Sequence, residues 1–119
     1  MRSREAQEQC IVIQWCNLQS NKYPELEYIF HCPNGGSRNK VEAINLKREG
    51  VKSGVPDLLL LTPKGKYTGL VIEMKWGKNK CTQNQIRWLE WLEKQGYKCK
   101  ICYSADEAIK AIKDYLKIK

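Results

Sequence analysis

Hydrophobic and polar positions alternate along the chain with two different periods, which predict the order of its elements. Helical spacing over residues 4–18 indicates a helix that starts after Ser3 as its N-cap and is largely buried. Tyr28–Cys32 has the composition of a strand. Residues 33–40 then read as a loop, and Val41–Glu49 as a short helix that ends at Gly50.

Two short β-prone runs in the middle of the chain predict a hairpin. Leu58–Thr62 and Gly69–Lys75 flank the turn-rich segment Pro63–Tyr67. If Gly65 lies at the centre of the turn, residues whose numbers sum to 130 face one another, as 57 and 73 do. Their Cβ atoms would then be about 5 Å apart.

The C-terminal third is predicted as helix, strand and helix. Thr82 and Gln85 have the spacing of a capping box, so a helix is expected from Thr82 to about Gln95, ended by Gly96. Tyr97–Tyr103 alternates as a strand, and Ser104 caps a final helix whose last apolar residue is Leu116. The order α-β-(α)-β-β-α-β-α predicts an α/β (α+β) fold, a mixed central β-sheet flanked by helices.

Composition limits the class of protein. The 119 residues, 42% hydrophobic and 29% charged, fit a single globular domain over 1–119. No apolar run is long enough to span a membrane and the start of the chain is too polar for a secretory signal, so we expect a cytosolic protein. Six scattered cysteines, several of them inside apolar segments, indicate buried free thiols. The single histidine, His31, is read as structural and argues against a zinc site.

The positive charge is concentrated around the hairpin. The net charge is +8, and residues 33–80 contain ten Lys or Arg against four Asp or Glu. Such a distribution suits a polyanionic partner. The alternative is a soluble domain that is simply basic.

Three polar side chains of the hairpin are expected on one face. Opposed carboxylates at Asp57 and Glu73 repel one another unless a cation neutralises them. Lys75 shares the face of Glu73, whereas Met74 points away from it. A divalent cation is the obvious neutraliser. The alternative is an ordinary solvated hairpin face.

These motifs together resemble the PD-(D/E)XK nuclease superfamily, which has a restriction-endonuclease-like core, and more narrowly its VRR-Nuc family. Pro56-Asp57 with Glu73-Met74-Lys75 alone is a weak pattern, but five segments agree in order and spacing. The other matching segments are Glu5 with Gln9, Pro33–Gly36 with Arg38, Gly50 with Gly54, and Gln85 with Trp88 and Leu89.

The resemblance implies a Mg²⁺- or Mn²⁺-dependent endodeoxyribonuclease. Its partner would be DNA, and neither a membrane partner nor a small-molecule substrate is expected. The chain is similar to stand-alone phage and bacterial members of the family. This similarity implies a homodimer that acts on structured or branched DNA, such as a four-way Holliday junction. The expected location is the cytosol of a bacterium or of a phage-infected host. A non-catalytic nucleic-acid-binding module on the same scaffold is the alternative. A third reading is a small interaction domain built on the tryptophan-rich helix from Thr82 to Gln95.

The resemblance also assigns roles. Asp57, Glu73, the backbone carbonyl of Met74 and Glu5 would be metal ligands, with Glu8 as a rival to Glu5. Glu5 is also explained by the helix dipole, which favours acidic residues in a first turn. With Asp57 and Glu73, Lys75 would be catalytic, as a base or as a stabiliser of negative charge.

Gln85 would reach the active site in addition to its capping role, with Trp88 packing beneath it in the core. Candidate DNA contacts are polar or basic residues around the site. They are Asn34, Arg38, Lys40, Lys52, Lys78 and Lys80.

Overall fold

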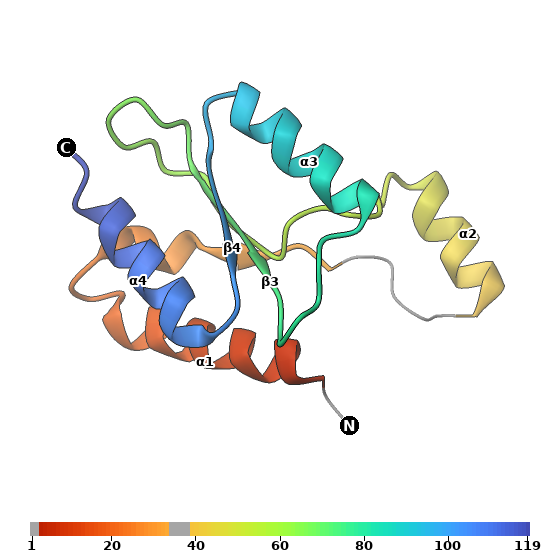
Figure 1. Cartoon of the computed structure of the whole chain (residues 1–119), viewed down its shortest axis with the longest axis horizontal. Coiled ribbons are helices and arrows are strands. Elements are labelled where there is room, and N and C mark those ends of the chain that lie inside the picture. Colours follow the sequence, from red (N-terminus) through yellow and green to blue (C-terminus); the bar gives the residue numbers. More distant parts are fainter. Residues whose placement is uncertain (1–2, 34–38) are drawn as a thin grey trace.

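The computed structural model describes residues 3–33 and 39–119, which form a four-stranded sheet with helices on both faces (Figure 1). The order of elements confirms the predicted fold class. The elements are helix α1 (Arg4–Gln19), 3₁₀ helix η1 (Pro24–Tyr28), strand β1 (Phe30–His31), helix α2 (Lys40–Arg48), strands β2 (Leu58–Leu60) and β3 (Leu70–Met74), helix α3 (Gln83–Lys94), strand β4 (Lys98–Cys102) and helix α4 (Ala105–Leu116).

The sheet is mixed, with strand order β1-β2-β3-β4. Strands β1, β2 and β3 pair antiparallel, and β4 pairs parallel to β3 after the α3 crossover. The hairpin register pairs Leu58 with Ile72 and Leu60 with Leu70, so paired numbers sum to 130 as predicted. Gly65, at the centre, has a φ of +54°, a conformation that favours glycine.

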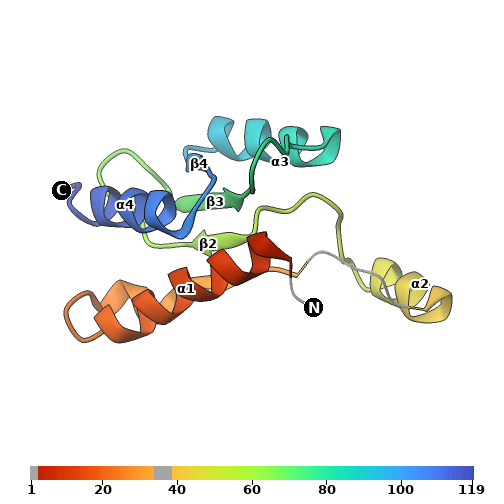
Figure 2. The same cartoon turned by 60° about the horizontal axis from the view of Figure 1, so that its bottom comes forward.

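The core lies between one face of the sheet and helices α1 and α4. Alternate residues of β2 and β3, including Leu58, Leu60 and Ile72, are buried with Val12 of α1 and Ile112 of α4. Helix α3 covers the opposite face (Figure 2). Because side chains alternate along a strand, the residues of β3 between its core positions point toward the α3 side.

Helix N-termini are capped where the sequence predicts. The side chains of Ser3, Thr82 and Ser104 each accept a hydrogen bond from a backbone N–H of the first turn. Thr82 and Gln85 form the complete capping box. The same chemistry at Asn39 begins α2.

Three sequence expectations need correction. The strand predicted at Tyr28–Cys32 is only Phe30–His31, because η1 occupies the preceding residues, with Pro24 at its start where a fixed φ favours a helical turn. Helix α1 is less buried than expected, since only Val12 and Cys16 are fully buried in it. None of the six cysteines, each within the described part, forms a disulfide, and only Cys16 and Cys102 are buried, so the expectation that all are buried is wrong.

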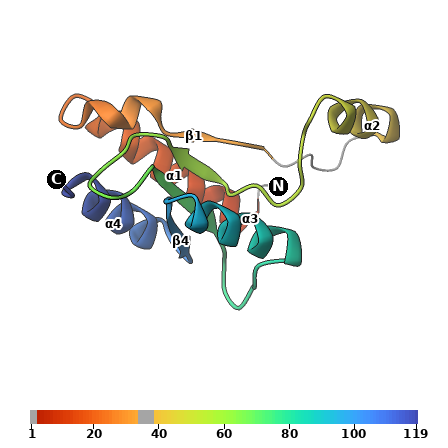
Figure 3. The ribbon, with the colours of Figure 1, turned by 90° about the horizontal axis from the view of Figure 1, so that it is seen from above.

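Helix α2 projects from the rest of the molecule (Figure 3). None of its nine residues is buried, and Val41 and Ile44 are 69% and 57% exposed. In residues 3–33 and 39–119, no helix is both long and apolar enough to cross a membrane.

Candidate active site

Asp57 and Glu73 meet where β2 begins and β3 ends. The Asp57 carboxylate accepts a hydrogen bond of 2.8 Å from the backbone N–H of Met74 and interacts with Glu73. Its backbone carbonyl lies 2.7 Å from Nδ1 of His31, which therefore donates to it. The structural role expected for His31 is thus to hold the main chain of Asp57.

Glu73 is almost completely buried, with 2% of its surface exposed. Burial, together with the neighbouring Asp57, raises the pKa of its carboxyl from 4.5 to about 8, although the charge of Lys75 acts in the opposite direction. Among residues 3–33 and 39–119, its buried Oε1 atom has no hydrogen-bond partner. A buried carboxyl oxygen of this kind lacks the compensation that polar atoms usually have in protein interiors.

The pair fits a hard divalent cation such as Mg²⁺ or Mn²⁺. A cation would neutralise the repulsion between the two carboxylates and provide a partner for the free oxygen of Glu73. Glu73 and Asp57 would be its protein side-chain ligands. In the described residues, no group of three or more His, Cys, Asp or Glu side chains is arranged to hold a metal ion.

Lys75 is fixed from two sides. Its Nζ atom donates a 2.7 Å hydrogen bond to Oε1 of Gln85 and lies 3.7 Å from Oε2 of Glu73. The same Gln85 oxygen accepts a hydrogen bond from the backbone N–H of Thr82. One oxygen of Gln85 therefore makes both the capping contact and the contact with Lys75, which places the start of α3 against the lysine.

The two glutamates of α1 have different surroundings. The Glu8 carboxylate accepts a hydrogen bond from the backbone N–H of Ala105 at the start of α4. Glu5 accepts one from the side chain of Asn79, and its charge contributes to the raised pKa of Glu73. Of the two, Glu5 is the one that acts electrostatically on Glu73.

The basic residues proposed to contact DNA are spread over three segments. Lys78 and Lys80 are exposed in the loop that leaves β3, directly after Lys75. Lys52 is exposed shortly before Asp57, and Lys40 begins α2. Asn34 and Arg38 lie outside the described residues.

Sequence reasoning missed a set of residues on α3. Trp88 was expected in the core, but it is half-buried at the wall of a groove, where its Nε1 donates to the backbone carbonyl of Ser53. Arg87, Trp91 and Lys94 also line this groove. Their spacing of four and three residues puts them on one helix face and is the signal that could have revealed them.

Comparisons with known proteins agree with this geometry. A family model described as the VRR-NUC domain matches residues 1–106. A solved structure described as a "VRR_NUC domain protein" is 35% identical to the chain, with a TM-score of 0.83, and the match covers 99% of this chain and 92% of that one. The curated proteins contain no significant match.

Proposed function

Because this chain belongs to the VRR-NUC domain family, and thus carries a nuclease-family domain, we propose that it is a metal-dependent endonuclease that hydrolyses DNA phosphodiester bonds. The observation that carries the proposal is the buried Glu73 carboxyl, opposed to Asp57 and flanked by Lys75. The proposed nuclease domain extends over residues 1–119.

Each residue of the site has a distinct role in this proposal. Asp57, Glu73 and the backbone carbonyl of Met74 would hold Mg²⁺ or Mn²⁺, and Glu5 would support the ion from α1. When bound, the ion supplies an activated water and neutralises charge on the phosphate. Lys75, held as a hydrogen-bond donor by Gln85, would stabilise the negative charge that develops on the phosphoryl oxygens.

We further propose that the protein acts as a homodimer on branched DNA, including four-way junctions, in the cytosol. Helix α2 supports dimerisation, because its nine residues include no buried one and short isolated helices are marginally stable in water. A second copy could cover Val41 and Ile44. Two symmetric sites would allow paired cuts across a branch.

The alternative function is a nucleic-acid-binding module without catalysis, favoured by the net charge of +8. It explains the basic surface but gives no reason for a buried glutamate with a free oxygen. Asp57, Glu73 and Lys75 are all retained, and they are brought together.

Cleavage of linear, flap, splayed and four-way DNA tests the proposal with Mg²⁺, with Mn²⁺ and with chelator. Asp57→Ala should reduce cleavage at least about 100-fold, the scale on which transition-state stabilisation is lost. The exposed Glu27→Ala variant is the control, with folding followed by circular dichroism. Full activity of a folded Asp57→Ala protein would contradict the mechanism, and binding without any cleavage would favour the alternative.

A further inference from the structure

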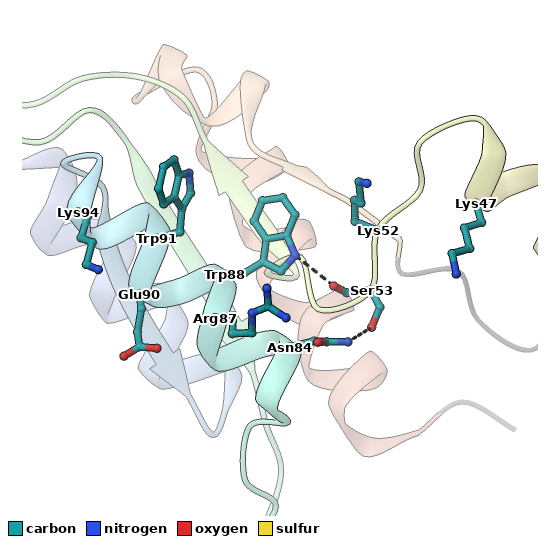
Figure 4. A pocket seen from close by; sticks show the side chains of 9 residues that line it. All are labelled: Lys47, Lys52, Ser53, Asn84, Arg87, Trp88, Glu90, Trp91 and Lys94. Carbon is teal, nitrogen blue, oxygen red and sulfur yellow. Dashed lines mark hydrogen bonds between the residues drawn. The ribbon is translucent and has the colours of Figure 1, made fainter.

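A groove of about 760 Å³ lies between α3 and the segment that leads from α2 into β2 (Figure 4). Its volume is that of sites that bind small organic groups, about 300–1,000 Å³. Trp88 and Trp91 project from α3, while the facing segment contributes lysine side chains. The charged and aromatic lining consists of Lys47, Lys52, Arg87, Lys94, Trp88 and Trp91, with Glu90 as the single acid.

The walls of the groove are tied together by hydrogen bonds. The Trp88 Nε1 donates to the Ser53 carbonyl at 3.1 Å, and Asn84 Nδ2 donates to the Ser53 hydroxyl at 3.0 Å. Gly54 makes this approach possible, because a Cβ atom there would lie 2.6 Å from the backbone of Asn84. The groove is therefore preformed, and Trp91, 59% exposed, presents its ring at the surface.

The chemistry of the lining favours a strand of unpaired nucleic acid. Four cations against one acid attract phosphates, and an exposed indole offers a flat surface on which any base can stack. A base inside a duplex is already stacked and paired, so it cannot use that surface. A second copy of the chain is less suited, because a net charge of +8 opposes its approach to a cationic groove.

The groove adjoins the candidate active site. Ser53 precedes Asp57 by four residues, and Asn84 is next to Gln85, whose oxygen holds Lys75. A strand lying in the groove would thus lead toward the carboxylate pair. We propose that the groove binds an unpaired DNA strand beside the scissile phosphate and stacks one base on Trp91, so that among branched substrates those with a single-stranded arm are bound more tightly than fully paired four-way junctions. The position beside the scissile phosphate rests on the proposed nuclease function, whereas binding of the strand in the groove does not.

Binding without catalysis tests the groove separately from the nuclease proposal. Fluorescence polarisation would measure Kd for a short labelled oligothymidine, a splayed duplex and a blunt duplex, all in chelator. Trp91→Ala should weaken binding of the first two about 5- to 100-fold, the worth of one stacked base. Binding to the blunt duplex should change less than twofold. Trp91→Phe, which retains a ring, should restore most of the loss.

Charge gives a second readout. Lys52→Ala or Lys94→Ala should lower the slope of log Kd against log salt by about 0.7 for each lost phosphate contact. Exposed matched controls outside the groove are Tyr28→Ala for the aromatic change and Lys117→Ala for the cation. Both controls should bind all three DNAs like the unaltered chain.

Two results would overturn the inference. In one, Trp91→Ala binds all three DNAs as the unaltered chain does. In the other, light scattering shows that Trp91→Ala loses a dimer while its DNA affinity falls equally for all three DNAs, which makes the groove a contact between copies. A chain that cleaves nothing but shows the Trp91 dependence supports the groove and contradicts only the nuclease function.

Discussion

Strand β3 is buried along its whole length, whereas helix α3, which covers the other face of the same sheet, has no buried residue. Both contribute to the candidate site, the strand with Glu73 and the helix with Gln85. The strand holds its carboxyl in a dry, fixed position, where electrostatic effects are strong. The helix presents its side chains to solvent, where they can meet a ligand. In the proposed function, chemistry and recognition would therefore belong to elements of opposite burial.

The start of α3 packs directly on Gly54, in the segment before β2, and substitution of this glycine should have the largest effect on stability. Gly54→Ala requires a φ of +89° for a residue with a Cβ atom, which would also collide with the backbone of Asn84. We expect a loss of about 2–4 kcal/mol in the free energy of unfolding, together with loss of cleavage. Urea denaturation measures the former.

Gly50→Ala is the matched control, because its φ is +108° but nothing lies within 4 Å of the added Cβ. It should cost about 1–2 kcal/mol, from backbone conformation alone. Equal losses for the two variants would show that the approach of α3 to Gly54 is not what stabilises this contact.

The buried carboxyl of β3 should make the metal-free protein pH-sensitive. Because the pKa of Glu73 is about 8 in the fold and 4.5 otherwise, the folded chain keeps a proton that the unfolded chain releases between these values. The stabilisation linked to this proton is complete below about pH 4.5 and is lost as the pH rises to about 8. The free energy of unfolding then falls by at most about 1.4 kcal/mol per pH unit. Thermal melts in chelator would measure the decline.

Glu73→Gln should flatten that dependence and raise stability by about 1–3 kcal/mol at pH 8, while cleavage disappears. Mn²⁺ should stabilise the unaltered chain and leave Glu73→Gln nearly unaffected. A glutamine variant that is less stable than the unaltered chain at pH 8 would contradict the burial penalty proposed for Glu73.

Gln85 joins the two regions through one oxygen, so its removal has an intermediate effect. Gln85→Ala loses the hydrogen bonds to Thr82 and Lys75, and we expect about 1 kcal/mol less stability and a lower kcat. Thr82→Ala weakens the same cap without touching the lysine. If both variants lower kcat equally, the Lys75 contact has no catalytic value.

The smallest effect on stability is expected on α2. Ile44→Ser should change the unfolding free energy of a monomer by less than about 0.5 kcal/mol, because the side chain is 57% exposed. It should nevertheless shift the mass measured by light scattering from dimer to monomer. Leu18→Ser, at 78% exposure on α1, is the control and should leave the mass unchanged. A dimer that survives Ile44→Ser would remove α2 from the interface.

The opposition of carboxylates at β3 was predictable from local sequence patterns, whereas the contribution of α3 was not, and only the family resemblance pointed to Gln85. Short apolar runs around one turn leave little choice of register, so the opposition of Asp57 and Glu73 followed from Gly65 as centre. The contact of Gln85 with Lys75 depends on how closely α3 approaches Gly54, which no local pattern encodes. The groove joins Lys52 to Trp91 across a tertiary contact, and for the same reason it escaped prediction.

Because α1 packs against α4, the core of the protein cannot form during synthesis until α4 has been made. Val12 and Cys16 share a core with residues of α4, and Glu8 binds the N–H of Ala105, 97 residues later. At about 5–20 residues per second, the first helix waits roughly 5 to 20 seconds for its partner. Strand β3 waits less long for its parallel neighbour β4, because Lys98 follows Met74 by 24 residues, or about 1 to 5 seconds at the same rate. The strand that carries Glu73 is therefore made before the strand that completes its pairing and before the helix that completes the core.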